Sequence, residues 1–157
     1  MQMTKGLSVG DRAPDFTLED QNGKVFRLAS IVGKKAVVIY FYPKDFTPGC
    51  TEEAYAFRDK YEVFIDAGAE VIGISSDSVE SHKRFAKELN LPYILLSDPG
   101  SKVRELYHAT SLGGIPGRVT FVIDKKGETR MVFSSQFQPT KHIQEALLVI
   151  AEIAKEK

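Results

Sequence analysis

Seven consecutive apolar residues at 36–42, Ala-Val-Val-Ile-Tyr-Phe-Tyr, constrain the fold of this 157-residue chain more than any other feature. No polar residue interrupts the run, so it predicts a strand that is buried within the protein. The turn-forming residues Pro43, Pro48 and Gly49 follow it, and Cys50 stands where a helix is expected to begin. The pattern predicts a central strand, a turn and a helix that carries a thiol in its first turn.

The rest of the chain is also expected to form strands and helices in alternation. A hairpin is expected at 16–28 because Asn22 and Gly23 form a strong turn signal between two short strands. The helix after the turn is expected to run over 50–66 with Gly68 as its stop. Its apolar residues fall at helical spacing on one face, namely Ala54, Phe57, Tyr61, Phe64 and Ile65. Further elements are expected as strands at 70–75, 93–97, 119–124 and 128–133 and as helices at 78–89, 101–107 and 140–154. This order predicts one α/β domain over 1–157, with a mixed central sheet, helices on both faces and an N-terminal β-hairpin extension.

The composition excludes several classes of function. Lys and Arg number 21, as do Asp and Glu, and no basic block is present, so there is no electrostatic case for a nucleic-acid or membrane partner. The first residues lack the apolar core of a signal peptide, so a cytoplasmic location is expected, with a mature organelle form left open. A single cysteine excludes an intrachain disulfide and a cysteine-rich metal site.

Cys50 is the leading candidate for a reactive group. Unpaired backbone N–H groups at a helix start carry partial positive charge, which favours a nucleophilic thiolate. The alternative is an inert cysteine in the core. The neighbours Pro48, Gly49, Thr51 and Glu52 are poor core residues, which favours the reactive interpretation.

The same segment resembles a known family. Pro43, Thr47 and Cys50 fit the Pro-x-x-x-Thr-x-x-Cys signature of peroxiredoxins, and residues 41–53 resemble the Q-type, or bacterioferritin comigratory protein, branch. The resemblance also includes residues 10–16, 73–78 and 116–124. It implies a thioredoxin-like fold and a thiol-dependent peroxidase that reduces hydrogen peroxide and alkyl hydroperoxides.

The resemblance implies a role for each candidate catalytic residue, and each also has an ordinary structural alternative. Cys50 is expected to attack the peroxide, Thr47 to hydrogen-bond it, and Arg118 to favour the thiolate and donate to both peroxide oxygens. Pro43 is expected to shape and shield the pocket, and Glu53, one helical turn beyond the cysteine, to hold the arginine in position. The alternatives are a turn or cap for Thr47, a turn for Pro43, a solvated strand end for Arg118 and a favourable helix-dipole charge for Glu53.

The histidines are not expected to act as bases. An arginine-stabilised thiolate needs none, and His82, on an expected helix, fits a packing or surface role, so neither His82 nor His108 is assigned to catalysis. The three histidines of the chain lack the spacing of metal ligands, and neither a metal nor another cofactor is expected.

The chain departs from the family pattern at the second cysteine. Many Q-type relatives carry a resolving cysteine five residues after the first or on the next helix, where this chain has Tyr55 and a cysteine-free stretch near Ala86. Oxidised Cys50 would then form a sulfenic acid that an outside thiol reduces, namely thioredoxin, glutaredoxin or glutathione. A peroxide sensor or a redox-regulated binding protein of the same fold remains the alternative function. With no aromatic-rich exposed stripe in the sequence, a monomer is expected.

Overall fold

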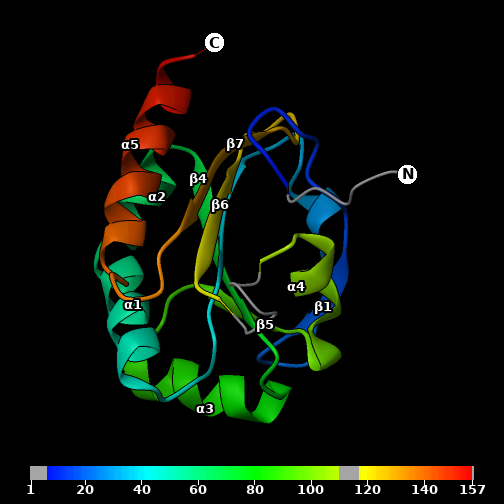
Figure 1. The fold of residues 1–157 in the computed structure, drawn as a ribbon, viewed down its shortest axis with the longest axis vertical. Helices are drawn as coiled ribbons and strands as arrows, with labels where there is room; N and C mark the ends of the chain where they lie inside the picture. The colour runs from blue at the N-terminus through cyan, green and yellow to red at the C-terminus, as the bar shows by residue number, and fades with distance from the viewer. Residues whose placement is uncertain (1–6, 110–116, 157) are drawn as a thin grey trace.

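A computed structural model describes residues 7–109 and 117–156. Its centre is a seven-stranded mixed sheet with the strand order β2-β1-β5-β4-β3-β6-β7 (Figure 1). The strands are β1 (Thr17–Asp20), β2 (Val25–Arg27), β3 (Ala36–Phe41), β4 (Ala69–Ser75), β5 (Ile94–Ser97), β6 (Val119–Ile123) and β7 (Thr129–Ser134). The helices are α1 (Pro48–Asp59), α2 (Tyr61–Asp66), α3 (Val79–Leu89), α4 (Lys102–Leu106) and α5 (Lys141–Lys155), with 3-10 turns η1 (Leu28–Ser30) and η2 (Pro99–Ser101).

The apolar run forms the central strand β3, as predicted. All six of its residues are buried, and it pairs in parallel with β4 and antiparallel with β6. Because side chains alternate along a strand, Val38 and Tyr40 enter one apolar cluster while Val37 and Ile39 enter another on the opposite face. The uninterrupted run is therefore explained by burial on both faces of the sheet.

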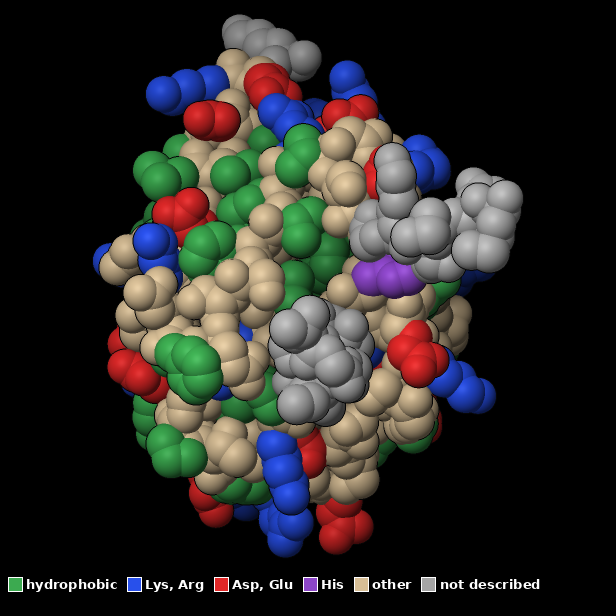
Figure 2. All heavy atoms as spheres, viewed as in Figure 1, with side chains coloured by type: hydrophobic (Ala, Val, Ile, Leu, Met, Phe, Trp, Pro, Cys, Tyr) green, Lys and Arg blue, Asp and Glu red, His purple; other side chains and the backbone are tan. Residues whose placement is uncertain are grey.

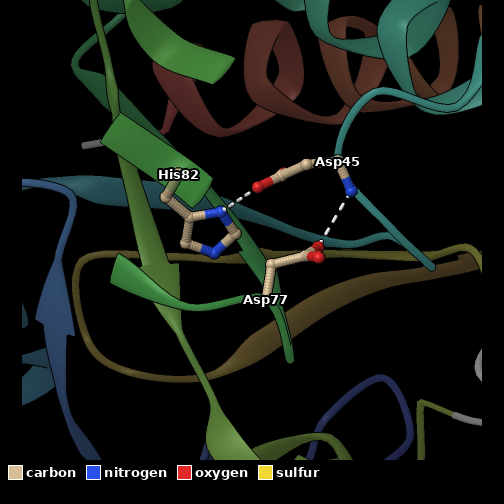
Figure 3. A group of neighbouring side chains, drawn as sticks. All are labelled: Asp45, Asp77 and His82. Atoms are coloured by element: carbon tan, nitrogen blue, oxygen red, sulfur yellow. Dashed lines mark hydrogen bonds and ion pairs between the residues drawn. The ribbon is translucent and has the colours of Figure 1, made fainter. Parts of the chain in front are cut away.

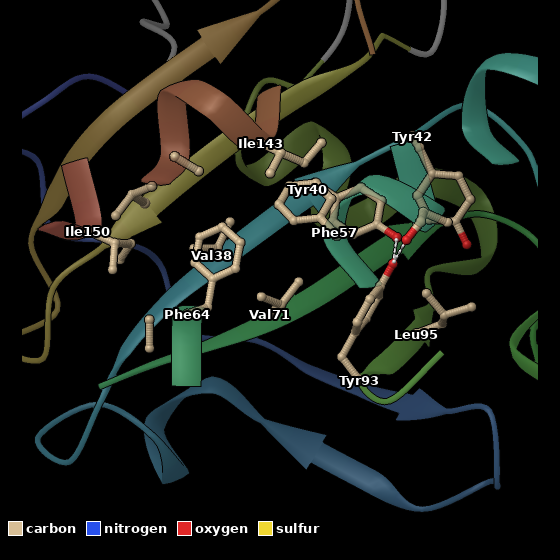
Figure 4. Close-up of a cluster of buried hydrophobic side chains, with 14 of the residues drawn as sticks. Val38, Tyr40, Tyr42, Phe57, Phe64, Val71, Tyr93, Leu95, Ile143 and Ile150 are labelled. Carbon is tan, nitrogen blue, oxygen red and sulfur yellow. Dashed lines mark hydrogen bonds between the residues drawn. The ribbon is translucent and has the colours of Figure 1, made fainter. Parts of the chain in front are cut away.

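Helices cover both of those faces. The cluster around Tyr40 includes Phe57 of α1, Phe64 of α2 and Ile143 of α5, whereas the opposite cluster includes Leu28 of η1 and Val103 of α4. The ring of Phe57 stacks on Tyr40 with 4.4 Å between ring centroids (Figure 4). Such a contact adds about 1 kcal/mol beyond the area that it buries. This stacking fixes α1, and with it the start of α1, against the central strand.

The N-terminal hairpin also forms where the turn signal predicted it. Asp20 Oδ1 accepts hydrogen bonds from the backbone N–H groups of Asn22 and Lys24, and Gly23 adopts the positive φ of 77° that the turn requires. Strand β1 pairs antiparallel with β5 as well as with β2, so the hairpin extends the sheet at one edge.

One prediction of local structure was wrong. The helix expected over 50–66 is two helices, because Lys60 leaves helical geometry with φ −108° and ψ 7°. Its N–H bonds back to the carbonyl of Phe57 in a tight turn, and α2 then packs against β4. As a result Ile65, expected on the buried face, is 37% exposed.

The surface charges and the lengths of the helices bear on the partners of the protein. On the face seen in Figure 2, acidic and basic side chains are interspersed rather than gathered by sign. Within residues 7–109 and 117–156, no helix is long and apolar enough to cross a membrane. Pro116, the first residue of the 116–124 match, lies outside the described residues.

Candidate active site

The strand-to-helix turn delivers Cys50 to the carboxyl end of β3. Thr47 is the N-cap of α1, Pro48 is its first residue, and Cys50 lies in its first turn. The first helical hydrogen bond runs from the N–H of Thr51 to the carbonyl of Thr47, so the N–H groups before it have no partner within the helix. Cys50 is only 1% exposed, which places the sulfur in a protected, electropositive position.

Arg118 is the positive charge beside the sulfur. Its Nη1 lies 3.6 Å from Cys50 Sγ and 2.7 Å from Glu53 Oε1. Burial works against the charge of Arg118, but the neighbouring Glu53 and Cys50 outweigh it and raise its pKa. A guanidinium held this closely stabilises negative charge on the sulfur and on an oxygen next to it.

The other side of Arg118 is held by a residue that the sequence did not suggest. Its Nε donates to the carbonyl of Gln136 at 3.3 Å, and its backbone N–H donates to Oε1 of the same glutamine at 3.0 Å. Gln136 follows β7, so the hairpin that carries Arg118 also orients it. A glutamine in a loop has no distinctive pattern, and no sequence signal could have identified it.

Gly49 provides the space in which Arg118 approaches the helix. A Cβ atom at position 49 would lie 2.9 Å from Arg118 Nη2, closer than nonbonded atoms normally approach. The glycine in front of the cysteine is therefore required for this geometry of the guanidinium. Sequence reasoning used Gly49 only as part of the turn.

Glu53 is fully buried one helical turn after Cys50. Burial raises the pKa of its carboxyl to about 8, while the charge of Arg118 and the hydrogen bond from it act in the opposite direction. Its second oxygen, Oε2, has no hydrogen-bond partner among the described residues. His142 Nδ1 of α5 is 3.7 Å from this oxygen, beyond normal hydrogen-bond length.

Thr47 and Pro43 lie in the loop between β3 and α1, and both are half-buried. The hydroxyl of Thr47 donates to the carbonyl of Lys44 at 2.8 Å, and it makes no cap bond to the helix. That bond uses the proton of the hydroxyl and leaves its oxygen free to accept. The structure thus brings together Cys50, Arg118 and Glu53 by direct contact and places Thr47 and Pro43 in the adjoining loop.

A buried polar cluster secures this loop to α3 (Figure 3). Asp45 Oδ2 lies 2.7 Å from His82 Nδ1, and His82 Nε2 lies 3.0 Å from the carbonyl of Leu96. Asp45 also accepts hydrogen bonds from the hydroxyls of Tyr42 and Ser81. Both ring nitrogens of His82 therefore lie within hydrogen-bond distance of an oxygen, one from the loop and one from β5.

The predicted packing role of His82 is therefore more specific than expected, because the ring contacts the loop through Asp45 at hydrogen-bond distance. Asp45, Asp77 and His82 also form the one group among the described residues whose ligand atoms are close enough to hold a metal ion. Asp77 Oδ2, however, already accepts the N–H of Asp45 and the hydroxyl of Ser75. Hydrogen bonds account for these three side chains, and we assign no metal to them.

A second buried arginine, also missed by the sequence reasoning, braces the end of β3. Arg104 of α4 donates to the carbonyls of Tyr42, Ala109 and Gly117 at 2.6–2.7 Å. Burial lowers its pKa, against the charge of Asp98 and Cys50. Arg104 thus connects the strand that leads into the Cys50 turn with the segment that leads to Arg118.

Comparisons with known proteins agree with this fold and geometry. Residues 9–132 match the model of the AhpC/TSA family. The chain is 53% identical over 149 residues to the chloroplastic peroxiredoxin Q proteins of Triticum aestivum and Sedum lineare, covering 94% of this chain and 68% and 80% of those proteins. Its structure is similar to the crystal structure of peroxidoxin BcpB from Mycobacterium tuberculosis, with a TM-score of 0.87, 38% identity, and coverage of 94% of this chain and 98% of that one.

A buried cysteine paired with an arginine, on a seven-stranded thioredoxin-like sheet with an N-terminal hairpin, defines a thiol-dependent peroxidase. The chain belongs to the AhpC/TSA family of peroxiredoxins, within its peroxiredoxin Q or bacterioferritin comigratory protein branch. The predicted fold class, family and enzyme class are confirmed. The chain has one cysteine, Cys50.

Proposed function

We propose that this peroxiredoxin reduces hydrogen peroxide and alkyl hydroperoxides through Cys50 alone, in a cycle that has no internal resolving thiol. The observation that carries the proposal is the contact of Cys50 Sγ with Arg118 Nη1 in a chain that contains no other cysteine. The sulfur attacks the terminal oxygen of the peroxide, the S–O bond forms as the O–O bond breaks, and the alkoxide leaves. Cys50 becomes a sulfenic acid.

Each neighbouring residue has a part in this step. Arg118 stabilises the thiolate and the charge that develops on the peroxide oxygens, because its guanidinium is already in place before reaction. The hydroxyl of Thr47 donates its proton to the carbonyl of Lys44, so its oxygen can accept a hydrogen bond from the peroxide. This hydrogen bond aligns the O–O bond with the sulfur. Pro43 shields the pocket, and Glu53 holds Arg118 through the 2.7 Å ion pair.

The positions at which relatives resolve the sulfenic acid support the one-cysteine cycle. Xanthomonas campestris peroxiredoxin Q, 29% identical with a TM-score of 0.83 over 95% of this chain and 98% of that one, has also been solved as cysteine-to-serine mutants at two positions 36 residues apart. In this chain the residue 36 positions after Cys50 is Ala86 of α3. Position 55 carries tyrosine, whose ring lies under the guanidinium of Arg58.

An external thiol therefore completes the cycle, and we propose thioredoxin, glutaredoxin or glutathione as its source. We further propose that the protein works as a monomer with a small substrate. Its curated relatives are named chloroplastic, so the cytoplasmic location expected from the sequence is proposed together with a mature organelle form as its alternative.

The first test is the Cys50→Ser variant, which should have no peroxidase activity because serine is not ionised at neutral pH and the chain has no other thiol. Turnover well above that of buffer would refute the assignment of Cys50.

The second test is mass spectrometry of wild-type protein after peroxide treatment. We expect a sulfenic acid that a dimedone-type reagent traps, mixed disulfides with the added thiol, and sulfinic acid at excess peroxide. Quantitative Cys50–Cys50 dimers that thioredoxin reduces efficiently would instead establish a cycle between two chains.

A further inference from the structure

Two acids in this site share one cation. Cys50 Sγ and Glu53 Oε1 contact the same nitrogen of Arg118, Nη1, at 3.6 and 2.7 Å. All three side chains are buried. In such surroundings one guanidinium compensates one negative charge, and a second anion is strongly disfavoured.

The unpaired oxygen of Glu53 shows which acid can remain neutral. Its side chain is 0% exposed, and Oε2 has no hydrogen-bond partner among the described residues. A carboxylate there would leave negative charge on a bare buried oxygen, whereas a carboxylic acid carries its proton on that atom. Burial accordingly raises the pKa of Glu53 to about 8, in spite of Arg118.

The histidine that faces Glu53 supplies no second cation. His142 Nε2 donates to the carbonyl of Ser135, and its Nδ1 accepts from the hydroxyl of Thr120, which is the neutral form of the ring. Burial, together with the charge of Arg118, lowers the pKa of His142 to about 4, although the bond to Ser135 opposes this. The imidazole that faces Glu53 from α5 is thus uncharged at neutral pH.

The remaining neighbours do not change this balance. Tyr40 of β3 and Tyr93, the residue before β5, have pKa values raised mainly by burial, and the charge of Glu53 contributes to the rise in both. Arg104, the other buried cation near the sulfur, is bound to three backbone carbonyls, and its charge interacts with that of Cys50, so it favours the thiolate as the anion of the site.

We propose that Glu53 stores the proton of Cys50: as the thiol becomes a thiolate, the carboxylate that shared Arg118 becomes a carboxylic acid. The reaction is Cys50–SH plus Glu53–COO⁻ giving Cys50–S⁻ plus Glu53–COOH, so the net charge of the site is unchanged. When the thiolate attacks ROOH, sulfur is oxidised to S–OH and the peroxide is reduced to RO⁻. One proton then goes to RO⁻ to form ROH, and Glu53 returns to the carboxylate that Arg118 pairs. Glu53 acts through Arg118, as a positioning residue with a titrating charge, and the proposal rests on the peroxidase function proposed above.

Coupled acids titrate in a recognisable way. In the wild type, thiolate should form in two steps, because the species with a thiol and a Glu53 carboxylate competes with the species with a thiolate and a carboxylic acid. Glutamine is neutral, as the carboxylic acid is, so in Glu53→Gln only one step remains, and its midpoint should lie within about half a pH unit of the first wild-type step. A purely structural role for Glu53 predicts a midpoint higher by about one pH unit or more, because Arg118 would lose its anchor.

The test is a pH titration of the ultraviolet absorbance of the thiolate in the wild type, in Glu53→Gln and in the control Glu52→Gln. Glu52 is the exposed acid next to Glu53 in the same helical turn, and its variant should titrate as the wild type does. Infrared spectroscopy of the wild type gives a measurement that does not depend on the folding of a variant. The C=O stretch of a buried carboxylic acid should be present at pH 7 and disappear when Cys50 is oxidised to the sulfenic acid.

A Glu53→Gln midpoint that is higher than the first wild-type step by about one pH unit or more, or no carboxylic acid band at pH 7, would each overturn the proposal. The thiolate titrations use no peroxide, and the infrared comparison needs only one oxidation of Cys50 rather than turnover. If the proposed peroxidase function were wrong but this proposal right, the protein would show no peroxide turnover, while the thiolate titrations and the infrared band would still give the expected results.

Discussion

Replacing Gly49 with alanine adds one methyl group beside the guanidinium that contacts Cys50. The new Cβ would lie 2.9 Å from Arg118 Nη2, and because Arg118 is the more movable partner, it should retreat by about 1 Å. At an effective dielectric constant of about 20, moving a charge from 3.6 Å to about 4.6 Å from the sulfur costs about 1 kcal/mol, or roughly fivefold in rate. Complete loss of the donor would cost on the order of 10².

Stability should change in the opposite direction. Gly49 lies within α1 and is not among the glycines with positive φ, so alanine fits its backbone. Restricting the unfolded chain at such a site contributes about 0.5–1 kcal/mol to the free energy of unfolding. We therefore expect Gly49→Ala to be as stable as the wild type or more so, while Cys50 is oxidised between five and about a hundred times more slowly.

The assay is rapid-mixing measurement of Cys50 oxidation, together with urea unfolding of the same samples. Glu52→Ala is the matched control, since it changes an exposed residue of the same helical turn. If Cys50 of the Gly49→Ala variant were oxidised at the wild-type rate, the reasoning would be refuted, because the position of Arg118 would then not limit the rate of oxidation.

Three further predictions concern neighbouring groups. Arg118→Met should slow oxidation of Cys50 by about 10² and move thiolate formation to higher pH, whereas Thr47→Val should slow oxidation with less effect on the thiolate titration; rapid mixing and ultraviolet titration measure both. His82→Leu leaves the buried Asp45 Oδ2 and the carbonyl of Leu96 without the ring that contacts them, and should lower the free energy of unfolding in urea by about 2 kcal/mol or more. Because the pKa of His142 is lowered to about 4 in the folded protein, the unfolded chain binds the extra proton between about pH 6.5 and 4. Folding stability should therefore fall as the pH decreases through that window, and less so in His142→Gln.

Each of these has an outcome that would contradict it. If Arg118→Met and Thr47→Val both oxidised at the wild-type rate, the pocket would be wrongly assigned. His108→Asn, at an exposed position with positive φ that asparagine tolerates, is the control for His82→Leu, and equal losses would argue against a stabilising contact between His82 and Asp45. Parallel pH profiles for the wild type and His142→Gln would exclude His142 as the source of acid sensitivity.

The parts of the fold that sequence reasoning predicted are those specified by neighbouring residues. The apolar run at 36–42 and the Asn22–Gly23 turn each determine their own local structure, and the structure confirms both. The break at Lys60 was missed because apolar residues continue at helical spacing on both sides of it, and no glycine or proline marks it.

The site was predictable only as far as its motif extends. Cys50, Arg118 and Glu53 meet as expected, but the groups that hold them come from distant parts of the chain. His82 lies 37 residues from Asp45, and Gln136 lies 18 residues from Arg118. Such pairs depend on how the sheet and helices pack, which no local pattern of residue types records.

The burial of Cys50 has a consequence for how the enzyme survives its substrate. A sulfur that is 1% exposed can be reached by a peroxide of a few atoms but not by the thiol of a protein reductant. In the one-cysteine cycle proposed above, recycling by a protein thiol would therefore wait for a local opening of the first turn of α1 and the loop before it, which Asp45 and the ring of Phe46 against Phe85 hold to α3. Every 1.4 kcal/mol in the free energy of that opening changes the population of open sulfenic acid tenfold, while the closed form stays exposed to a second peroxide. Hydrogen exchange at the first turn of α1 would measure this opening directly. The balance between repair and permanent inactivation is thus set by the packing of a loop against a helix, a property that selection can adjust without altering the chemistry at the sulfur.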